Sequence, residues 1–446
     1  MKSVAKRIIV FIIAAVLCMA LTSCSNPMLF APADSLLSPP LYNSQYEGLV
    51  EAFNAHSGSG TNYSNPTGGD NLSAINVKDL DGDGKEEAVI LYIDRNEDSV
   101  VHVSVYDYFS DKWNFCADFA GYGDKADSIL FDDFNKDGYV EIMVSWSYSG
   151  INNAGAVSVY STKSMKMTYE EIFTTACDVS TAVDMDGDGL REILFVSSDN
   201  NGSTITRDAA LIKMGDGEFE VMGTTPVDPN VTGYVSCKAE KANGDQPMKI
   251  YLDAPKSGGM MITEVLFWDA ELNMLTAPLY DAETGANSLS LRYELINCAD
   301  INNDGQIEIP VQTPYENNDN SGTGKFYVTD WVYFDVSKPA FYVRTFVNVK
   351  DGYFINLGSL NSSDIYVREL GTSNWSSWIV CKKTSKVTGG DVLFTVISVP
   401  AGKYDKDKYS SYITIMQNTD VVVCVSINSD KFDEATIKKT VMKLPS

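Results

Sequence analysis

Four short acidic segments hold the side chains of this chain that are best suited to chemistry. Each has Asp at position 1, Asp or Asn at position 3, Asp at position 5, Gly at position 6 and Glu at position 9. Ligands on alternate residues of a tight loop converge on one point, and the glycine permits the sharp bend. Hard oxygen ligands in this number suit Ca²⁺ better than Mg²⁺ or zinc. We therefore predict Ca²⁺ as the cofactor, with up to four ions bound.

We call these segments the first loop (residues 79–87), the second loop (133–141), the third loop (184–192) and the fourth loop (300–308). Position 7 of each loop is expected to offer its main-chain carbonyl, and the glutamate closes the shell. The predicted metal ligands, in chain order, are Asp79, Asp81, Asp83, Lys85, Glu87, Asp133, Asn135, Asp137, Tyr139, Glu141, Asp184, Asp186, Asp188, Leu190, Glu192, Asp300, Asn302, Asp304, Gln306 and Glu308.

The segments differ from EF-hand loops at position 12, where an EF-hand requires a glutamate. Here that position is Ile90, Val144, Phe195 and Val311, all apolar. The residues on both sides of the loops are β-branched, aromatic or otherwise apolar, as in buried strands. Each loop is therefore predicted to join two strands.

The loops recur with a regular period. Their first positions leave one gap, between the third and fourth loops, about twice as long as the others. A degenerate copy fits there, with Ala239 at position 1, Lys241 at position 3, Gly244 at position 6 and Pro247 at position 9. We predict that this copy keeps the turn but binds no metal. A period of 50 to 60 residues indicates a repeat architecture.

Each period contains about four strands joined by polar turns, which is typical of a β-propeller blade. We predict a mainly β fold: a propeller of about five four-stranded blades over residues 72–349, followed by a small α+β domain over 350–446. An open β-solenoid is the alternative architecture. A sixth blade is the alternative for the C-terminal part, in which residues 429–442 are expected to form a helix.

The N-terminus has the features of an export signal. Residues 1–23 combine a positive start with an apolar run too short for a comfortable membrane span. The run ends in Leu21-Thr22-Ser23-Cys24, which is similar to the lipobox of bacterial lipoproteins and predicts lipidation at Cys24. An ordinary secretory signal is the alternative. Residues 24–41 form the predicted lipidated linker, and 42–71 an N-terminal helix and lead-in. The expected location is outside the cytoplasmic membrane, anchored to it by lipid.

The four loops resemble the FG-GAP/VCBS repeats of integrin-α-type propellers and bacterial surface proteins. The whole layout is similar to VCBS-repeat lipoproteins of clostridial and related Firmicutes, although clear Phe-Gly and Gly-Ala-Pro elements are absent. The resemblance covers residues 1 to about 350. It implies a calcium-stabilised propeller and carries over no catalytic residue.

Other function classes are disfavoured by composition. A formal charge of −26 argues against nucleic-acid binding, which requires a basic footprint. The two histidines, His56 and His102, have no metal-ligand spacing, and no nucleophile elbow, zinc motif or phosphate loop occurs. The aromatic residues of Trp146-Ser147-Tyr148 and Trp375-Ser376-Ser377-Trp378 could bind sugar, or pack the blades or the second domain. Six cysteines follow Cys24, and most are expected to be buried free thiols.

Three functions remain. The favoured hypothesis is a non-catalytic surface module that binds or scaffolds a protein or a glycan. The second is a carbohydrate-active enzyme, a lyase or a glycosidase, because paired acids suffice for that chemistry. The third is a purely structural envelope lipoprotein.

Overall fold

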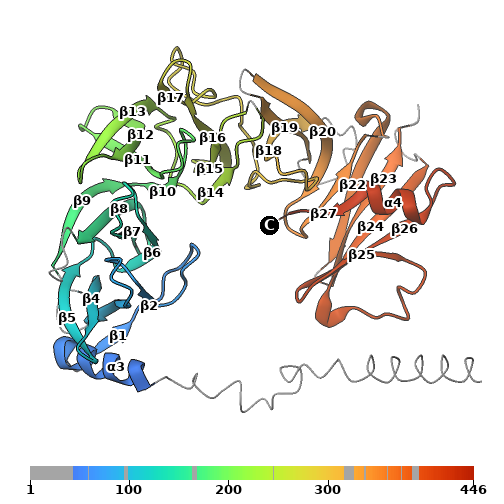
Figure 1. Ribbon diagram of the computed structural model, residues 1–446. Helices are drawn as coiled ribbons and strands as arrows, with labels where there is room; N and C mark the ends of the chain where they lie inside the picture. The colour runs from blue at the N-terminus through green and yellow to red at the C-terminus, as the bar shows by residue number, and fades with distance from the viewer. Residues whose placement is uncertain are drawn as a thin grey trace, which may run out of the picture. The chain divides into compact units, whose positions relative to one another are not determined.

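The computed structural model describes residues 44–445 apart from 59, 95–98, 163–167, 245, 316–325, 336–337, 359, 373 and 384–390. The predicted leader, Cys24 and the linker lie outside the described residues. The described chain is mainly β, as predicted: it forms six antiparallel sheets, three of them four-stranded, and two α-helices. Figure 1 labels these elements in chain order.

The first three sheets contain the first, second and third loops. The first sheet comprises β1 (Thr61–Tyr63), β2 (Ile75–Lys78), β3 (Glu87–Asp94), β4 (Val101–Phe109) and β5 (Lys112–Ala120), with β1 and β2 both pairing with β3. The second comprises β6 (Lys125–Asp132), β7 (Glu141–Tyr148), β8 (Ile151–Thr162) and β9 (Tyr169–Cys177). The third comprises β10 (Val179–Val183), β11 (Glu192–Asn200), β12 (Ile205–Met214) and β13 (Phe219–Pro226).

The last three sheets hold the degenerate copy, the fourth loop and the C-terminal strands. The fourth sheet comprises β14 (Ser236–Glu240), β15 (Lys249–Lys256), β16 (Met260–Asp269) and β17 (Met274–Thr276). The fifth comprises β18 (Glu308–Tyr315), β19 (Phe326–Asp335), β20 (Lys338–Asn348), β21 (Tyr353–Asn356) and β27 (Val441–Lys443). The sixth comprises β22 (Ile365–Thr372), β23 (Trp375–Lys382), β24 (Val392–Pro400), β26 (Val421–Ile427) and β25 (Ile413–Gln417).

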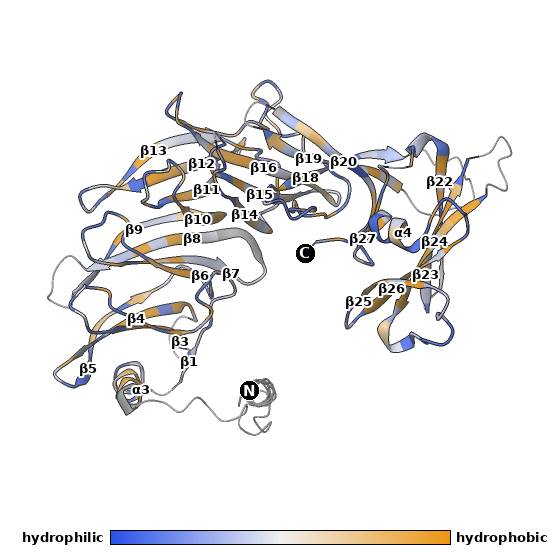
Figure 2. Cartoon of the chain, turned by 45° about the vertical axis from the view of Figure 1, so that its right-hand side comes forward, coloured by the Kyte–Doolittle hydropathy of each residue, from blue (hydrophilic) through white to orange (hydrophobic). Residues whose placement is uncertain are grey.

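The strands that follow the loops are buried on both faces near their starts, and in β11 each face packs on a different neighbouring sheet. In β11, Ile193 and Phe195 belong to a core shared with the second sheet. Leu194 and Val196 belong to a core shared with the fourth sheet. Successive side chains of a strand point to opposite faces, so a strand between two cores reads as a continuous apolar run. Figure 2 shows hydrophobic residues along the strands and mostly hydrophilic loops between them.

The same arrangement links every consecutive pair of sheets. Separate buried clusters join the first sheet to the second, the second to the third, the third to the fourth, the fourth to the fifth and the fifth to the sixth. The sheets that contain the second, third and fourth loops thus pack on one neighbouring sheet at each face, which holds the strand after the loop in place.

The C-terminal part differs in detail from the sequence-based expectation. The predicted boundary at residue 350 falls inside the fifth sheet, because β21 and β27 both belong to it. The expected helix over 429–442 is shorter: α4 runs from Glu434 to Thr440. Asp433 caps it by accepting a hydrogen bond from the Thr436 amide at 2.7 Å, and the chain after it extends to pair with β21. The division into domains stays a prediction.

Residues 44–58 and 108–115 form a compact unit of their own. Its helix, α3 (Ser44–Ser57), buries Leu49 and Phe53, in line with the helix predicted over 43–55. The His56 ring stacks on Phe115 with 3.7 Å between the ring centroids. Short one-turn 3-10 helices occur at Ser362–Asp364 and Ala401–Lys403. None of the described helices is both long and apolar enough to cross a bilayer.

Candidate metal sites

The four acidic loops share one backbone conformation, held by the aspartate at position 1. Its Oδ2 accepts a hydrogen bond from the amide of the position-6 glycine at 3.0, 2.9, 3.0 and 2.8 Å in the four loops. The position-5 aspartate accepts from the amide of position 7 at 2.7, 2.9, 2.8 and 2.8 Å. These hydrogen bonds hold the backbone of the loop in a tight turn and orient the aspartate side chains toward its interior.

Left-handed backbone at two positions accounts for part of the sequence pattern. The position-6 glycines have φ between 84° and 91°. Position 4 is also left-handed, at Gly82, Lys136, Gly187 and Asn303. Glycine and asparagine enter this region most readily. The need for left-handed backbone at position 4 could not be recognised from the sequence, because the second loop has Lys136 there instead of glycine or asparagine.

The glutamate at position 9 reaches back beneath each loop. Its Oε2 accepts from the position-2 amide at 2.6, 3.1, 2.8 and 3.0 Å in the four loops. All four glutamate side chains are at most 2% exposed. Because each begins a strand buried on both faces, its carboxylate is fixed directly under the aspartates.

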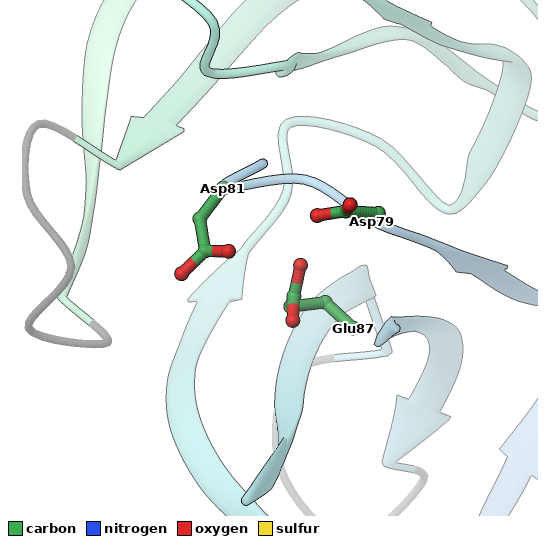
Figure 3. A group of neighbouring side chains, drawn as sticks. All are labelled: Asp79, Asp81 and Glu87. Carbon is green, nitrogen blue, oxygen red and sulfur yellow. The ribbon is translucent and has the colours of Figure 1, made fainter. Parts of the chain in front are cut away.

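Carboxylates converge most closely in the first and third loops. Oxygens of Asp79, Asp81 and Glu87 all lie within 4.8 Å of one another, and Figure 3 shows the three carboxylates turned toward a common space. An equivalent triad in the third loop comprises Asp184, Asp186 and Glu192. The structure thus brings together the predicted ligands at positions 1, 3 and 9 of both loops.

The second and fourth loops have one carboxylate fewer. The Asn135 side chain donates to Asp137 Oδ2 at 3.0 Å, and that of Asn302 donates to Asp304 Oδ2 at 2.9 Å. An amide nitrogen therefore stands where the first and third loops have an oxygen. Position 7 of each loop contributes its amide to the turn, and its carbonyl stays a predicted ligand.

The electrostatics of the loops suit a cation. Burial raises the pKa of Glu87, Glu141 and Glu308 to about 7, with neighbouring aspartates adding to the effect. Glu87 Oε1 is buried without a hydrogen-bond partner. Such an orphaned oxygen is costly unless a donor or an ion satisfies it. A divalent cation bound by oxygens would supply that partner, so the residues present fit calcium.

The degenerate copy requires a correction. In all four acidic loops, the residue before position 1 pairs with position 9, as Lys78 does with Glu87. In the fourth sheet the equivalent pair is Glu240 with Lys249. Position 1 is therefore Lys241 and position 9 is Lys249; the alignment on Ala239 was wrong by two residues. The alignment failed because Gly244 was matched to the position-6 glycine.

The corrected register gives the degenerate loop a lysine where the others have glutamate. Lys249 Nζ lies 2.7 Å from Glu240 Oε1, and both side chains are buried. Glu240 Oε2 also accepts from the amide of Ile307 in the fourth loop at 2.7 Å. An internal ion pair thus stabilises this turn. With this register Cys237 lies four residues before position 1 of its loop, whereas Cys298 lies two residues before position 1 of the fourth loop.

Three side chains that sequence reasoning missed contact the position-9 glutamates from the next strand. They are Asp107 on β4, Ser161 on β8 and Lys213 on β12. Only the register of the hairpin after each loop identifies them. Elsewhere, His102 Nδ1 lies 3.0 Å from Asp118 Oδ2, and Tyr92 donates to the same carboxylate. Burial of His102 makes this network part of the first sheet's interior.

One pocket, with a volume of about 450 Å³, lies between the third loop and the degenerate loop. Its wall includes Asp184 and Asp186 from the third loop, Met248 and Trp268 from the fourth sheet, and Glu271. Of the aromatic residues considered for sugar binding, Trp146 is 2% exposed and Trp378 is 7% exposed, so both pack inside cores. Trp375 is partly exposed, and Tyr148 is 40% exposed. The six described cysteines are all free, and four of them are buried, as expected.

Comparisons with known proteins identify no family. No family model matches the chain, and no curated protein matches it. Among solved structures, a rhamnogalacturonan lyase of Bacillus licheniformis matches with a TM-score of 0.29 and 12% identity, covering 84% of this chain and 73% of that one. A mannose phosphorylase from Leishmania mexicana matches with a TM-score of 0.25 and 11% identity, covering 58% and 82%. Likenesses this low leave the function to be inferred from the chain's own residues.

Proposed function

We propose that this chain is a calcium-binding β-propeller lipoprotein of the cell surface that binds or scaffolds a protein or a glycan. The observation that carries the proposal is the recurrence of one loop conformation with inward-facing carboxylates above a buried glutamate. Each of the four loops, at the start of a buried strand, concentrates negative charge that a cation would offset.

The propeller architecture rests on the order of the sheets. Each sheet is antiparallel and packs on the sheets before and after it in the chain, as propeller blades do. The first five sheets correspond to the five proposed blades. The first loop joins the paired strands β2 and β3, and its acidic sequence is the feature by which the chain resembles FG-GAP/VCBS repeats.

Calcium is proposed to stabilise the fold by binding only when the loops are formed. A ligand that binds the folded state alone adds stability by mass action, about 2.7 kcal/mol at a concentration of 100 Kd. Residues 25–446 should therefore melt at a higher temperature in millimolar calcium than in chelator. An Asp133→Asn variant should lose part of this difference, whereas Asp208→Asn, an exposed aspartate on β12, should keep it. Equal melting temperatures in the two buffers would refute calcium binding.

We propose binding and not catalysis because the acidic side chains that recur in each repeat are those that would hold a cation. The pocket between the third loop and the degenerate loop offers carboxylates, among them the exposed Glu271, which can accept hydrogen bonds from sugar hydroxyls. Immobilised residues 25–446 should retain a defined envelope protein or glycan in calcium, and a Glu271→Ala variant should weaken retention of a glycan. Release of reducing sugar or unsaturated uronide from envelope polysaccharide would instead favour the enzyme.

The membrane anchor is proposed from the lipobox-like residues before Cys24. A cell that expresses the full chain should incorporate labelled fatty acid into it and hold it in the membrane fraction. A Cys24→Ala variant should lose the label. A labelled Cys24→Ala chain would contradict lipidation at this residue.

A further inference from the structure

The four acidic loops differ in what faces the glutamate at position 9. Its Oε2 is bound to the loop backbone in every case, so Oε1 is the oxygen left for another partner. In the second loop, Ser161 donates to Glu141 Oε1 at 2.7 Å. In the fourth loop, Tyr333 is the cross-strand partner of Glu308, and the Asn302 side chain donates to Glu308 Oε1 at 3.3 Å. Both loops receive only neutral groups.

The third loop receives a cation from its own chain. Lys213 Nζ lies 2.6 Å from Asp186 Oδ2, 2.7 Å from Asp188 Oδ2 and 2.9 Å from Glu192 Oε1. These carboxylates come from positions 3, 5 and 9, three of the predicted calcium ligands. Lys213 is on β12, the hairpin partner of the strand that begins with Glu192. A lysine ammonium has three donors, and here all three have a carboxylate within reach.

The environment of Lys213 keeps it charged. Burial opposes the charge, but the hydrogen bonds to Asp186, Asp188 and Glu192 outweigh it and hold the pKa of Lys213 well above its usual range. The same bonds lower the pKa of Asp188. A calcium ion entering this loop would have to displace the ammonium from these three carboxylates.

In the first loop, a negatively charged residue takes the place that Lys213 has in the third. Asp107 on β4 is the cross-strand partner of Glu87, and its side chain is buried beside the carboxylates of the loop. Glu87 Oε1 is buried and has no hydrogen-bond partner, so a bound ion would be its partner. Glu192 Oε1 in the third loop has no hydrogen-bond partner either, but Lys213 Nζ lies 2.9 Å from it. Three aspartates, Glu87 and Asp107, with Lys85 paired to Asp83, give this cluster a formal charge of −4, against −3 for the third loop with Lys213 included.

We propose that the residue facing the position-9 glutamate sets the calcium affinity of each loop: Asp107 makes the first loop the tightest site, and Lys213 takes the place of calcium in the third. This inference rests on the proposed calcium binding of the other loops. Affinity at oxygen sites is tuned by the number of charged ligands and by their rigidity. The lysine supplies a single charge and hydrogen bonds in place of an ion that needs six to eight oxygens.

The test is the number of calcium ions bound by purified residues 25–446, measured by equilibrium dialysis with metal analysis and by calorimetric titration. The wild-type protein should bind three ions at saturation. Lys213→Met, which keeps the length of the side chain, should bind a fourth. Lys439→Met is the matched control, since it removes an equal charge from α4, and it should bind three.

The first loop is tested on the tightest binding step. Asp107→Asn should weaken that step by about tenfold or more while the stoichiometry stays at three. Asp208→Asn, which removes an exposed carboxylate from β12, should leave it unchanged. An Asp107→Asn protein with wild-type affinity at every step would overturn the assignment of the first loop.

Melting temperatures distinguish a variant with altered calcium binding from one that is only poorly folded. Without Lys213 the third loop should depend on calcium, so Lys213→Met should melt below the wild type in chelator and recover in calcium. A fourth ion in the wild type, or three ions in Lys213→Met with an equal loss of melting temperature in both buffers, would overturn the role of Lys213. If neither protein binds calcium, the proposed function fails, and this inference fails with it.

Discussion

Arg292 Nη2 lies 2.7 Å from Asp253 Oδ1, and neither side chain is exposed to solvent. Asp253 is on β15, whereas Arg292 belongs to the long irregular segment between the fourth and fifth sheets. The same carboxylate accepts from Thr263 Oγ1 at 2.7 Å and from the Cys298 amide at 3.1 Å. One buried carboxylate therefore ties this segment, which leads into the fourth loop, to the fourth sheet.

Arg292→Met should be strongly destabilising, because it leaves the Asp253 charge buried without its counter-ion. Removal of one partner from a buried pair typically costs about 3–5 kcal/mol. The matched control is Arg344→Met, which breaks a partly exposed pair with Asp330 and should cost about 0–1 kcal/mol. Denaturant unfolding followed by circular dichroism measures both. Equal losses would show that the Arg292 pair contributes no more than a surface ion pair.

Gly305→Ala isolates the conformational requirement of the acidic loops. Gly305 has a φ of +90°, and a Cβ added there would meet no atom within 4 Å. The expected loss of about 1–2 kcal/mol in unfolding free energy therefore comes from the left-handed backbone alone. Gly402→Ala is the control, because that glycine also has open space around it but no left-handed φ. If the two variants are equally stable, the loop conformation is not maintained in solution.

The acidic loops and the strands beside them could be predicted because both signals are local. Ligand spacing within nine residues identifies the loop, and continuous apolar runs identify strands with two buried faces. The degenerate loop could not be aligned, because its anchor is the pairing of Glu240 with Lys249 and not Gly244. The contact of Lys213 with the third loop could not be predicted for the same reason. Lys213 lies 21 residues beyond Glu192, and only the register of the hairpin places the two residues together.

Thiol counting tests the cysteine chemistry. The six cysteines from Cys116 to Cys424 are all free in the structure. Residues 25–446, denatured without reductant, should therefore react with six equivalents of a thiol reagent. Protein that has first been reduced gives the reference value. A count of zero would show three disulfides, and the buried positions would have to rearrange to form them, because disulfide geometry is strict.

Glu264 should make stability fall as pH rises toward neutrality. Its fully buried carboxylate accepts hydrogen bonds from the Asp228 amide and the Asn287 side chain, and it lies near the Asp228–Lys256 ion pair. Burial raises its pKa to about 7, above the 4.5 that is usual for a glutamate. The folded state therefore binds the proton more tightly than the unfolded chain. This contribution is complete below pH 4.5 and is lost as pH rises through 7.

Glu264→Gln, which stays neutral, should remove this dependence. The difference in unfolding free energy between the variant and the wild type should shift in favour of the variant by roughly 3 kcal/mol between pH 4.5 and pH 8. Measuring both proteins in saturating calcium keeps the contribution of the loop glutamates equal, so the difference reports Glu264 alone. Glu283→Gln, an exposed position, should give a difference that is flat with pH. A flat difference for Glu264→Gln as well would show that the buried carboxylate ionises as easily in the folded protein as in the unfolded chain, which its burial among Asp228, Lys256 and Asn287 argues against.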